Sequence, residues 1–116
     1  MSAKYLAAII VLLATLLSGC EAQLGARETR GAAAISRYGC GSCHTVSGIR
    51  GANGLVGPPL TGIRSRLYVA GMLENTPENM TAWIHNPKAI NPKTAMPVVG
   101  ASEQDASDIA AYLYAK

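Results

Sequence analysis

The apolar and polar positions of this 116-residue chain predict three helices joined by long loops. Residues 27–38 place small apolar side chains and one isoleucine among charged residues, as in a helix with one buried face, and Gly39 would end it. A second helix is expected over residues 76–85 and a third from Ser102. The apolar residues of the third helix recur at the spacing of a single face: Ala106, Ile109, Ala110 and Leu113. The pattern therefore predicts an all-α domain.

Capping residues and prolines mark the ends of the second and third helices. Thr76 stands before Pro77, which pairs a favoured capping residue with a proline at the first helical position. Asn86-Pro87 is expected to stop this helix, because the residue before a proline disfavours helical backbone. Ser102 and Asp105 are spaced like a capping box. Two segments rich in glycine and proline are expected to be irregular loops: residues 45–66 and 86–100. No strand pattern is apparent.

The first twenty residues have the organisation of an export signal. Lys4 supplies a positive charge, and the apolar run of 13 residues from Tyr5 to Leu17 is shorter than the roughly 20 residues that span a bilayer. The run ends in Leu17-Ser18-Gly19-Cys20, which resembles the lipoprotein signal of bacteria, in which the cysteine is lipidated and becomes the new N-terminus. We expect a signal peptide over residues 1–19 and a lipid on Cys20. An uncleaved anchor or an ordinary signal peptide is the alternative, and each implies export.

Composition indicates a small domain whose core needs additional stabilisation. Residues 20–26 would form a short lipidated tether, and residues 27–116 a single domain. The chain contains no Phe but 12 Gly and 6 Pro, and a thin core of this size usually depends on disulfides, a metal or a cofactor. The net charge of +3 and the absence of an Arg/Lys stripe exclude a nucleic-acid-binding surface.

The sequence Cys40-Gly41-Ser42-Cys43-His44 carries the chemistry. Its spacing lets two thiols add to the two vinyl groups of one haem while the adjoining His44 ligates the iron, which is the attachment pattern of haem c. A covalent haem would also supply the additional stabilisation that the thin core needs. Three alternatives are a thioredoxin-like redox pair, a disulfide closing a tiny loop, and a zinc site, for which His85 is the remaining ligand of the Cys and His types.

From Gly31 to Leu113 the chain resembles the monohaem, class I cytochromes c. The resemblance rests on the haem attachment pattern, on Gly57-Pro58-Pro59-Leu60-Thr61-Gly62 and on the segment from Trp83 to Pro97. It implies a small cytochrome c fold, with three to four helices and long loops around one covalently bound haem c. It also implies that the Pro58 carbonyl accepts the Nδ1–H of His44 and that Leu60 contacts the haem ring.

The same resemblance implies roles for residues around the ring. Met96 would be the second axial ligand, since it lies in a loop framed by prolines. Met72, Met80 and His85 are its rivals for that role. The other residues expected in the haem pocket are Arg66, paired with a propionate, Tyr68 and Thr94, donating to one, and Trp83, packed on the ring. Arg64 is the alternative to Arg66 as the propionate partner.

The chain departs from the family pattern in two places. Gly31 lies nine residues before Cys40, where the family usually has eight, so Gly39 reads as a one-residue insertion that could distort the helix end. Lys93 stands where the family often has glycine. A contact between Gly31, Ile35 and Tyr112 is expected where the first and last helices cross.

A haem with both axial positions filled predicts a carrier of single electrons rather than an enzyme, with no small-molecule substrate. After residue 19 there are only three lysines (Lys88, Lys93 and Lys116), too few for a strongly basic docking face. A tether and weak steering together favour a membrane-bound respiratory partner, either a terminal oxidase or a quinol-oxidising complex. The domain would lie on the periplasmic side of a bacterial membrane, inner or outer. The alternatives are a peroxidase or gas sensor with a labile sixth ligand, and a haem subunit that functions only inside a larger assembly.

Overall fold

The computed structural model describes residues 3, 5 and 24–116 of the chain. Nearly all of the expected signal peptide lies outside the described residues, and so do Cys20 and the start of the tether. Among the described residues, no helix combines the length and apolar character that crossing a membrane requires.

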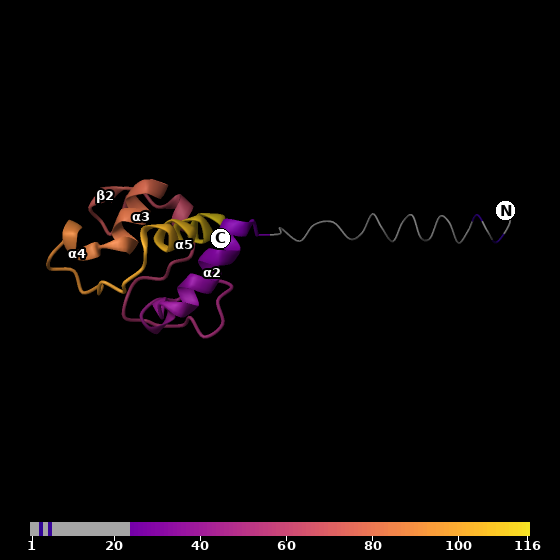
Figure 1. Cartoon of the computed structure of the whole chain (residues 1–116), viewed down its shortest axis with the longest axis horizontal. Helices are drawn as coiled ribbons and strands as arrows, with labels where there is room; N and C mark the ends of the chain where they lie inside the picture. The colour runs from indigo at the N-terminus through magenta and orange to yellow at the C-terminus, as the bar shows by residue number, and fades with distance from the viewer. Residues whose placement is uncertain (1–2, 4, 6–23) are drawn as a thin grey trace.

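Four helices and one small hairpin make up the domain (Figure 1). Helix α2 covers Ala26–Arg37, α3 covers Pro77–His85, α4 covers Pro87–Ile90 and α5 covers Glu103–Ala115. Two 3₁₀ turns, η1 (Cys40–Ser42) and η2 (Ile63–Ser65), lie between α2 and α3. They are followed by the two-residue strands β1 (Tyr68–Val69) and β2 (Leu73–Glu74), which pair antiparallel. The three predicted helices are confirmed, as is the all-α class.

The predicted capping residues begin α3 and α5. The Thr76 hydroxyl accepts a hydrogen bond from the Asn79 N–H at 3.1 Å, and the Ser102 hydroxyl accepts one from the Asp105 N–H at 3.0 Å. Each bond satisfies one N–H that the first turn of a helix leaves without a main-chain partner. The starts of these two helices are therefore determined by capping hydrogen bonds that can be predicted from the sequence.

Two predictions about the loops were wrong. Residues 86–100 were expected to lack helix, but Pro87–Ile90 form α4, because the Asn86 side chain that follows α3 also caps the next turn by accepting from the Ala89 N–H at 3.1 Å. Strands were not expected, yet β1 and β2 form a hairpin. Its turn places Ala70 at φ 52° and Gly71 at φ 70°, and alanine is uncommon at such angles, so the sequence carries no recognisable hairpin signal.

The crossing of α2 and α5 holds the domain together. A Cβ atom on Gly31 would lie 2.0 Å from the Asp108 carbonyl oxygen and 3.0 Å from Tyr112 Cβ, so the absence of a side chain lets the two helices touch. The expected approach of Gly31 to Tyr112 is confirmed, and Ile35 and Tyr112 are both buried in the same core. The main core includes side chains from both helices: Ala34, Ile35, Ala106, Ile109, Ala110, Tyr112 and Leu113.

Asp108 is a charged residue in the middle of this crossing, with 1% of its surface exposed. Its carboxylate accepts from Arg30 Nε at 2.7 Å, from Arg30 Nη2 at 3.2 Å and from Gln104 Nε2 at 3.1 Å. These bonds from α2 and from α5 itself satisfy the buried charge. The hydrogen bond from Arg30 is the main cause that holds the pKa of Asp108 below its ordinary value, against the opposing effect of burial.

Candidate haem site

A cavity of about 450 Å³ opens among α2, the loops after it, α3 and the segment before α5. Its wall is mainly apolar and includes core residues such as Ile35, Ile84 and Leu113. All ten side chains predicted to attach, ligate or contact the haem line it: Cys40, Cys43, His44, Pro58, Leu60, Arg66, Tyr68, Trp83, Thr94 and Met96. The fold thus brings together residues that are more than fifty positions apart in the sequence.

Cys40 and Cys43 reach the cavity from the 3₁₀ turn η1. Helix α2 ends at Arg37, Tyr38 caps it, and Gly39 adopts the left-handed conformation at φ 69°. This glycine turns the chain sharply directly after the helix. The N–H groups of Cys43 and His44 then bond to the Cys40 carbonyl at 3.2 and 3.0 Å, which closes the turn and places both thiols and the imidazole on one short segment.

The His44 ring is oriented by the proline loop. Its Nδ1 lies 2.7 Å from the Pro58 carbonyl oxygen. A carbonyl can only accept, so Nδ1 carries the proton and Nε2 is the nitrogen with a free lone pair. Gly57 lies against the ring, where a Cβ atom would fall 2.4 Å from Cε1, and the Gly57 N–H bonds to the Cys43 carbonyl at 2.7 Å. The hydrogen bond to Pro58 therefore fixes the tautomer of the His44 ring, and the contact with Gly57 fixes its position.

Met96 lies in a loop that is closed by hydrogen bonds between residues that are close in sequence. The Thr94 hydroxyl accepts from the Met96 N–H at 3.2 Å, and the Thr94 N–H donates to the Asn91 carbonyl at 3.0 Å. The Lys88 ammonium donates to the Thr94 carbonyl. Met96 itself is half-buried, with its side chain on the cavity wall.

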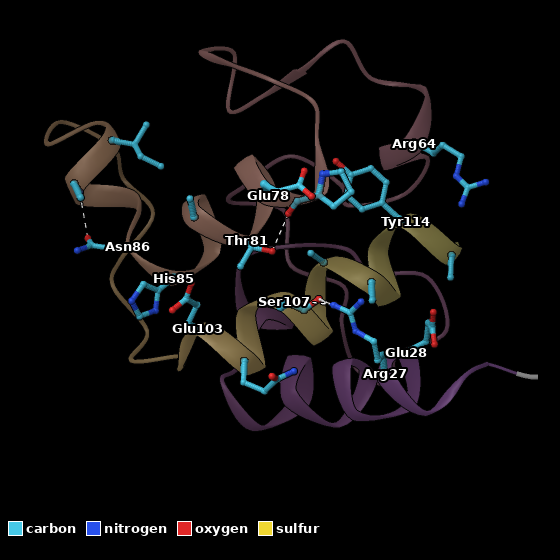
Figure 2. Close-up of a pocket in the computed structure, with 18 residues that line it drawn as sticks. Arg27, Glu28, Arg64, Glu78, Thr81, His85, Asn86, Glu103, Ser107 and Tyr114 are labelled. Atoms are coloured by element: carbon cyan, nitrogen blue, oxygen red, sulfur yellow. Dashed lines mark hydrogen bonds between the residues drawn. The ribbon is translucent and has the colours of Figure 1, made fainter.

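The rivals of Met96 lie in different surroundings. Met80 also lines the cavity, but it is buried in helix α3 and forms part of the main core. Met72 is 52% exposed in the hairpin turn and does not line the cavity. One nitrogen of the His85 ring bonds to the Ala101 carbonyl at 2.8 Å. His85 lines a separate groove, shown with Arg64 and Tyr114 in Figure 2.

Comparison with known proteins decides the family. The family model described as cytochrome c matches residues 28–115, which is most of the chain. This chain belongs to the cytochrome c family. A curated relative, cytochrome c oxidase subunit 2 of Alkalihalophilus pseudofirmus (strain ATCC BAA-2126 / JCM 17055 / OF4), is 39% identical over 75 residues. That alignment covers 64% of this cytochrome c and 21% of the relative, so the chain spans about a fifth of the relative's length. No solved structure matches the chain.

Membership of this family implies a covalently bound haem c with its iron, and the described residues fit that group. The cavity is within the range of about 300–1,000 Å³ that is usual for cofactor sites, and its wall is largely apolar. Cys40 and Cys43 are free thiols on the wall. Burial raises the pKa of the Cys40 thiol, which is the opposite of what a thioredoxin-like reactive cysteine needs.

Two glycines that shape the site were not singled out from the sequence. A Cβ atom on Gly41 would lie 2.6 Å from Ala52 Cα, and one on Gly54 would lie 2.5 Å from the Ser42 carbonyl oxygen. The Gly54 N–H also bonds to the Gly41 carbonyl at 3.0 Å. The loop after His44 thus packs directly on the Cys40–Ser42 turn. The glycine content of residues 45–66 was the available signal, but it does not say which glycine meets which backbone.

Proposed function

We propose that this cytochrome c is a membrane-tethered carrier that moves single electrons between respiratory components, to or within a terminal oxidase or a quinol-oxidising complex. The observation that carries the proposal is the shared cavity, which gathers the two thiols, the oriented imidazole and the Met96 thioether. The bound haem supplies one-electron chemistry between Fe(III) and Fe(II).

The chain's residues hold and saturate that group. Cys40 and Cys43 would form the two thioether bonds, and His44 would ligate the iron through Nε2, because its Nδ1 donates to Pro58. Met96 would be the second axial ligand, on a loop whose bonds to Thr94 and Lys88 limit its freedom. If His44 and Met96 both ligate the iron, neither oxygen nor peroxide would be able to bind it. Leu60, Trp83, Tyr68 and Arg66 complete the wall, the last two as candidate propionate partners.

The proposed partner follows from the tether, the charge and the named relative. A lipid on Cys20 would keep the domain at the periplasmic face of a bacterial membrane. A fixed neighbour needs little electrostatic steering, in agreement with the few lysines. The relative named cytochrome c oxidase subunit 2 supports a respiratory oxidase as the partner. Stoichiometric co-purification with an oxidase or quinol-oxidising complex from detergent-solubilised membranes would support this assignment, and strong loss of turnover with added salt would count against it.

Absorption spectroscopy of the holoprotein tests the carrier function. We expect the far-red band of a sulfur–iron bond in the oxidised form and no change when carbon monoxide is added to the reduced form. Met96→Ala should remove the band and open the iron to carbon monoxide, whereas Met80→Leu should leave both unchanged. Ready binding of carbon monoxide by the unmodified protein would reject the carrier and favour a peroxidase or gas sensor with a labile sixth ligand.

A further inference from the structure

The loop that orients His44 is itself held by a second side chain. Arg66 Nη2 donates to the Pro59 carbonyl and, at 3.2 Å, to the Thr61 carbonyl. Among the described residues, no main-chain N–H donates to the carbonyls of Pro58, Pro59 or Thr61. Pro58 and Pro59 also have no N–H to donate. The carbonyls of these three residues are therefore fixed by two side chains, His44 at Pro58 and Arg66 at Pro59 and Thr61.

Arg66 is fixed in turn from helix α5. Its N–H bonds to the Ile63 carbonyl at 3.1 Å, which closes the turn η2. The Asn75 amide Nδ2 donates to the Arg66 carbonyl at 2.7 Å and to the Ile63 carbonyl at 2.8 Å. The Asn75 Oδ1 accepts from the Tyr114 hydroxyl of α5. The two amide hydrogens of Asn75 and its oxygen are thus all engaged in holding the base of the Arg66 side chain.

We infer that Arg66 is a positioning residue for His44, and that Asn75 and Tyr114 act through Arg66. The cationic guanidinium forms charge-assisted bonds that hold the peptide groups beside Pro58, and so keep the Pro58 carbonyl aimed at Nδ1. A strong bond at Nδ1 makes the imidazole a more basic ligand, which stabilises Fe(III). The inference rests on the proposed function in one respect, namely that His44 ligates the iron.

This role differs from pairing with a haem propionate. Both bonds to the proline loop come from Nη2, and Nε and Nη1 make no hydrogen bond within the described part of the chain. The two roles therefore predict different results for Arg66→Lys, which keeps the positive charge but removes the planar guanidinium group. Propionate pairing through charge predicts an unchanged potential. Positioning predicts a weaker bond at His44 Nδ1 and hence a higher midpoint potential.

The test measures hydrogen exchange of the His44 Nδ1–H by NMR in the ferrous holoprotein, together with the midpoint potential. We expect Arg66→Lys and Asn75→Ala to speed this exchange by about tenfold or more, as for the loss of charged or amide hydrogen bonds from a local opening step, and to raise the potential. Tyr114→Phe, which removes one hydroxyl far along α5, should shift both quantities in the same direction by a smaller amount. Arg64→Lys is the matched control: Arg64 lies in the same turn but lines the groove of Figure 2, and both quantities should stay unchanged.

Unchanged exchange in Arg66→Lys and Asn75→Ala would overturn the inference while leaving the carrier function intact. If Arg66→Lys fails to take up haem, the nearly isosteric Tyr114→Phe decides the question, and unchanged exchange in that variant overturns the inference. An unmodified protein whose iron is not bound by His44 would overturn both the inference and the proposed function. Unchanged exchange together with an unchanged potential in Arg66→Lys would assign Arg66 to the propionate alone.

Discussion

Residue 57 touches the ring of His44 so closely that a Cβ atom there would lie 2.4 Å from the ring carbon Cε1. The two residues are also joined through the main chain, since the Gly57 N–H bonds to the carbonyl of Cys43, the residue before His44. Gly57 therefore helps to hold the imidazole in position and does not act as a flexible hinge. Any side chain at this position must displace either the ring or the loop that carries Pro58.

Gly57→Ala is accordingly expected to move the imidazole away from its productive position. We predict a loss of haem incorporation or of low-spin ligation by at least about tenfold, in the range found when groups that orient a metal ligand are removed. The yield of haem-containing protein and the absorption spectrum measure this effect. Gly25→Ala is the control, because its Cβ would meet only the flexible end of the Glu28 side chain. Normal haem content in Gly57→Ala would show that the loop can adjust.

Gly31→Ala should destabilise the domain through the helix crossing. In an open helix interior, this change normally stabilises by about 0.5–1 kcal/mol. Here the added Cβ would lie 2.0 Å from the Asp108 carbonyl oxygen, which is main chain and cannot rotate away. We expect a net loss of about 3 kcal/mol in the free energy of unfolding, measured by denaturant titration of the holoprotein. Ala33→Ser, at an exposed position of the same helix, should change it by no more than about 0.5 kcal/mol.

The stability of the domain should depend on pH through the ionisation of Asp108. Its hydrogen bond from Arg30 lowers its pKa in the folded state. A lowered folded-state pKa means that the stabilisation is present above the unfolded value of about 3.9 and is lost as pH falls through the folded value. Asp108→Asn should therefore unfold more easily at pH 7 by about 2 kcal/mol, the scale of a lost charged hydrogen bond in a buried site.

As the pH falls through the lowered pKa of the native Asp108 carboxyl, that carboxyl becomes protonated and the two proteins should converge. Thermal melts from pH 7 down to pH 2 measure this difference. Glu103→Gln removes an exposed acid from the same helix and is the control for the loss of one negative charge. A constant gap between Asp108→Asn and the unmodified protein across this range would assign the effect to packing rather than to charge.

The elements that were predicted correctly are those whose cause is local in the sequence. Thr76 and Ser102 cap their helices through bonds to residues three positions later, and this spacing can be read directly. The haem-attachment segment, whose role stays a prediction, is an equally local pattern, because five consecutive residues define it. Asn86 shows the limit of this reasoning: the sequence indicates a stop before Pro87, whereas the asparagine both follows α3 and caps α4.

The features that were missed depend on residues far apart in the chain. Asp108 lies next to the apolar face of α5, and its burial becomes favourable only when Arg30 of α2 is placed opposite it. Gly41 and Gly54 are needed because two loops touch, and no periodic pattern records such a contact. The network of Arg66, Asn75 and Tyr114 joins three segments in the same way. Each of these arrangements required the tertiary structure to be seen.

The Met96 loop should be weakened by losing the bonds at Thr94. The Thr94 hydroxyl accepts from the Met96 N–H, and the Thr94 carbonyl accepts from Lys88. Thr94→Val keeps the shape but removes the acceptor, and Lys88→Met removes the donor. We expect each change to reduce the far-red sulfur–iron band and to speed carbon monoxide binding to the reduced protein by about threefold to tenfold, as for bonds worth about 1 kcal/mol. Lys93→Met is the control, since the Lys93 side chain makes no hydrogen bond within residues 24–116. Equal rates in all three variants would mean that packing alone holds the loop.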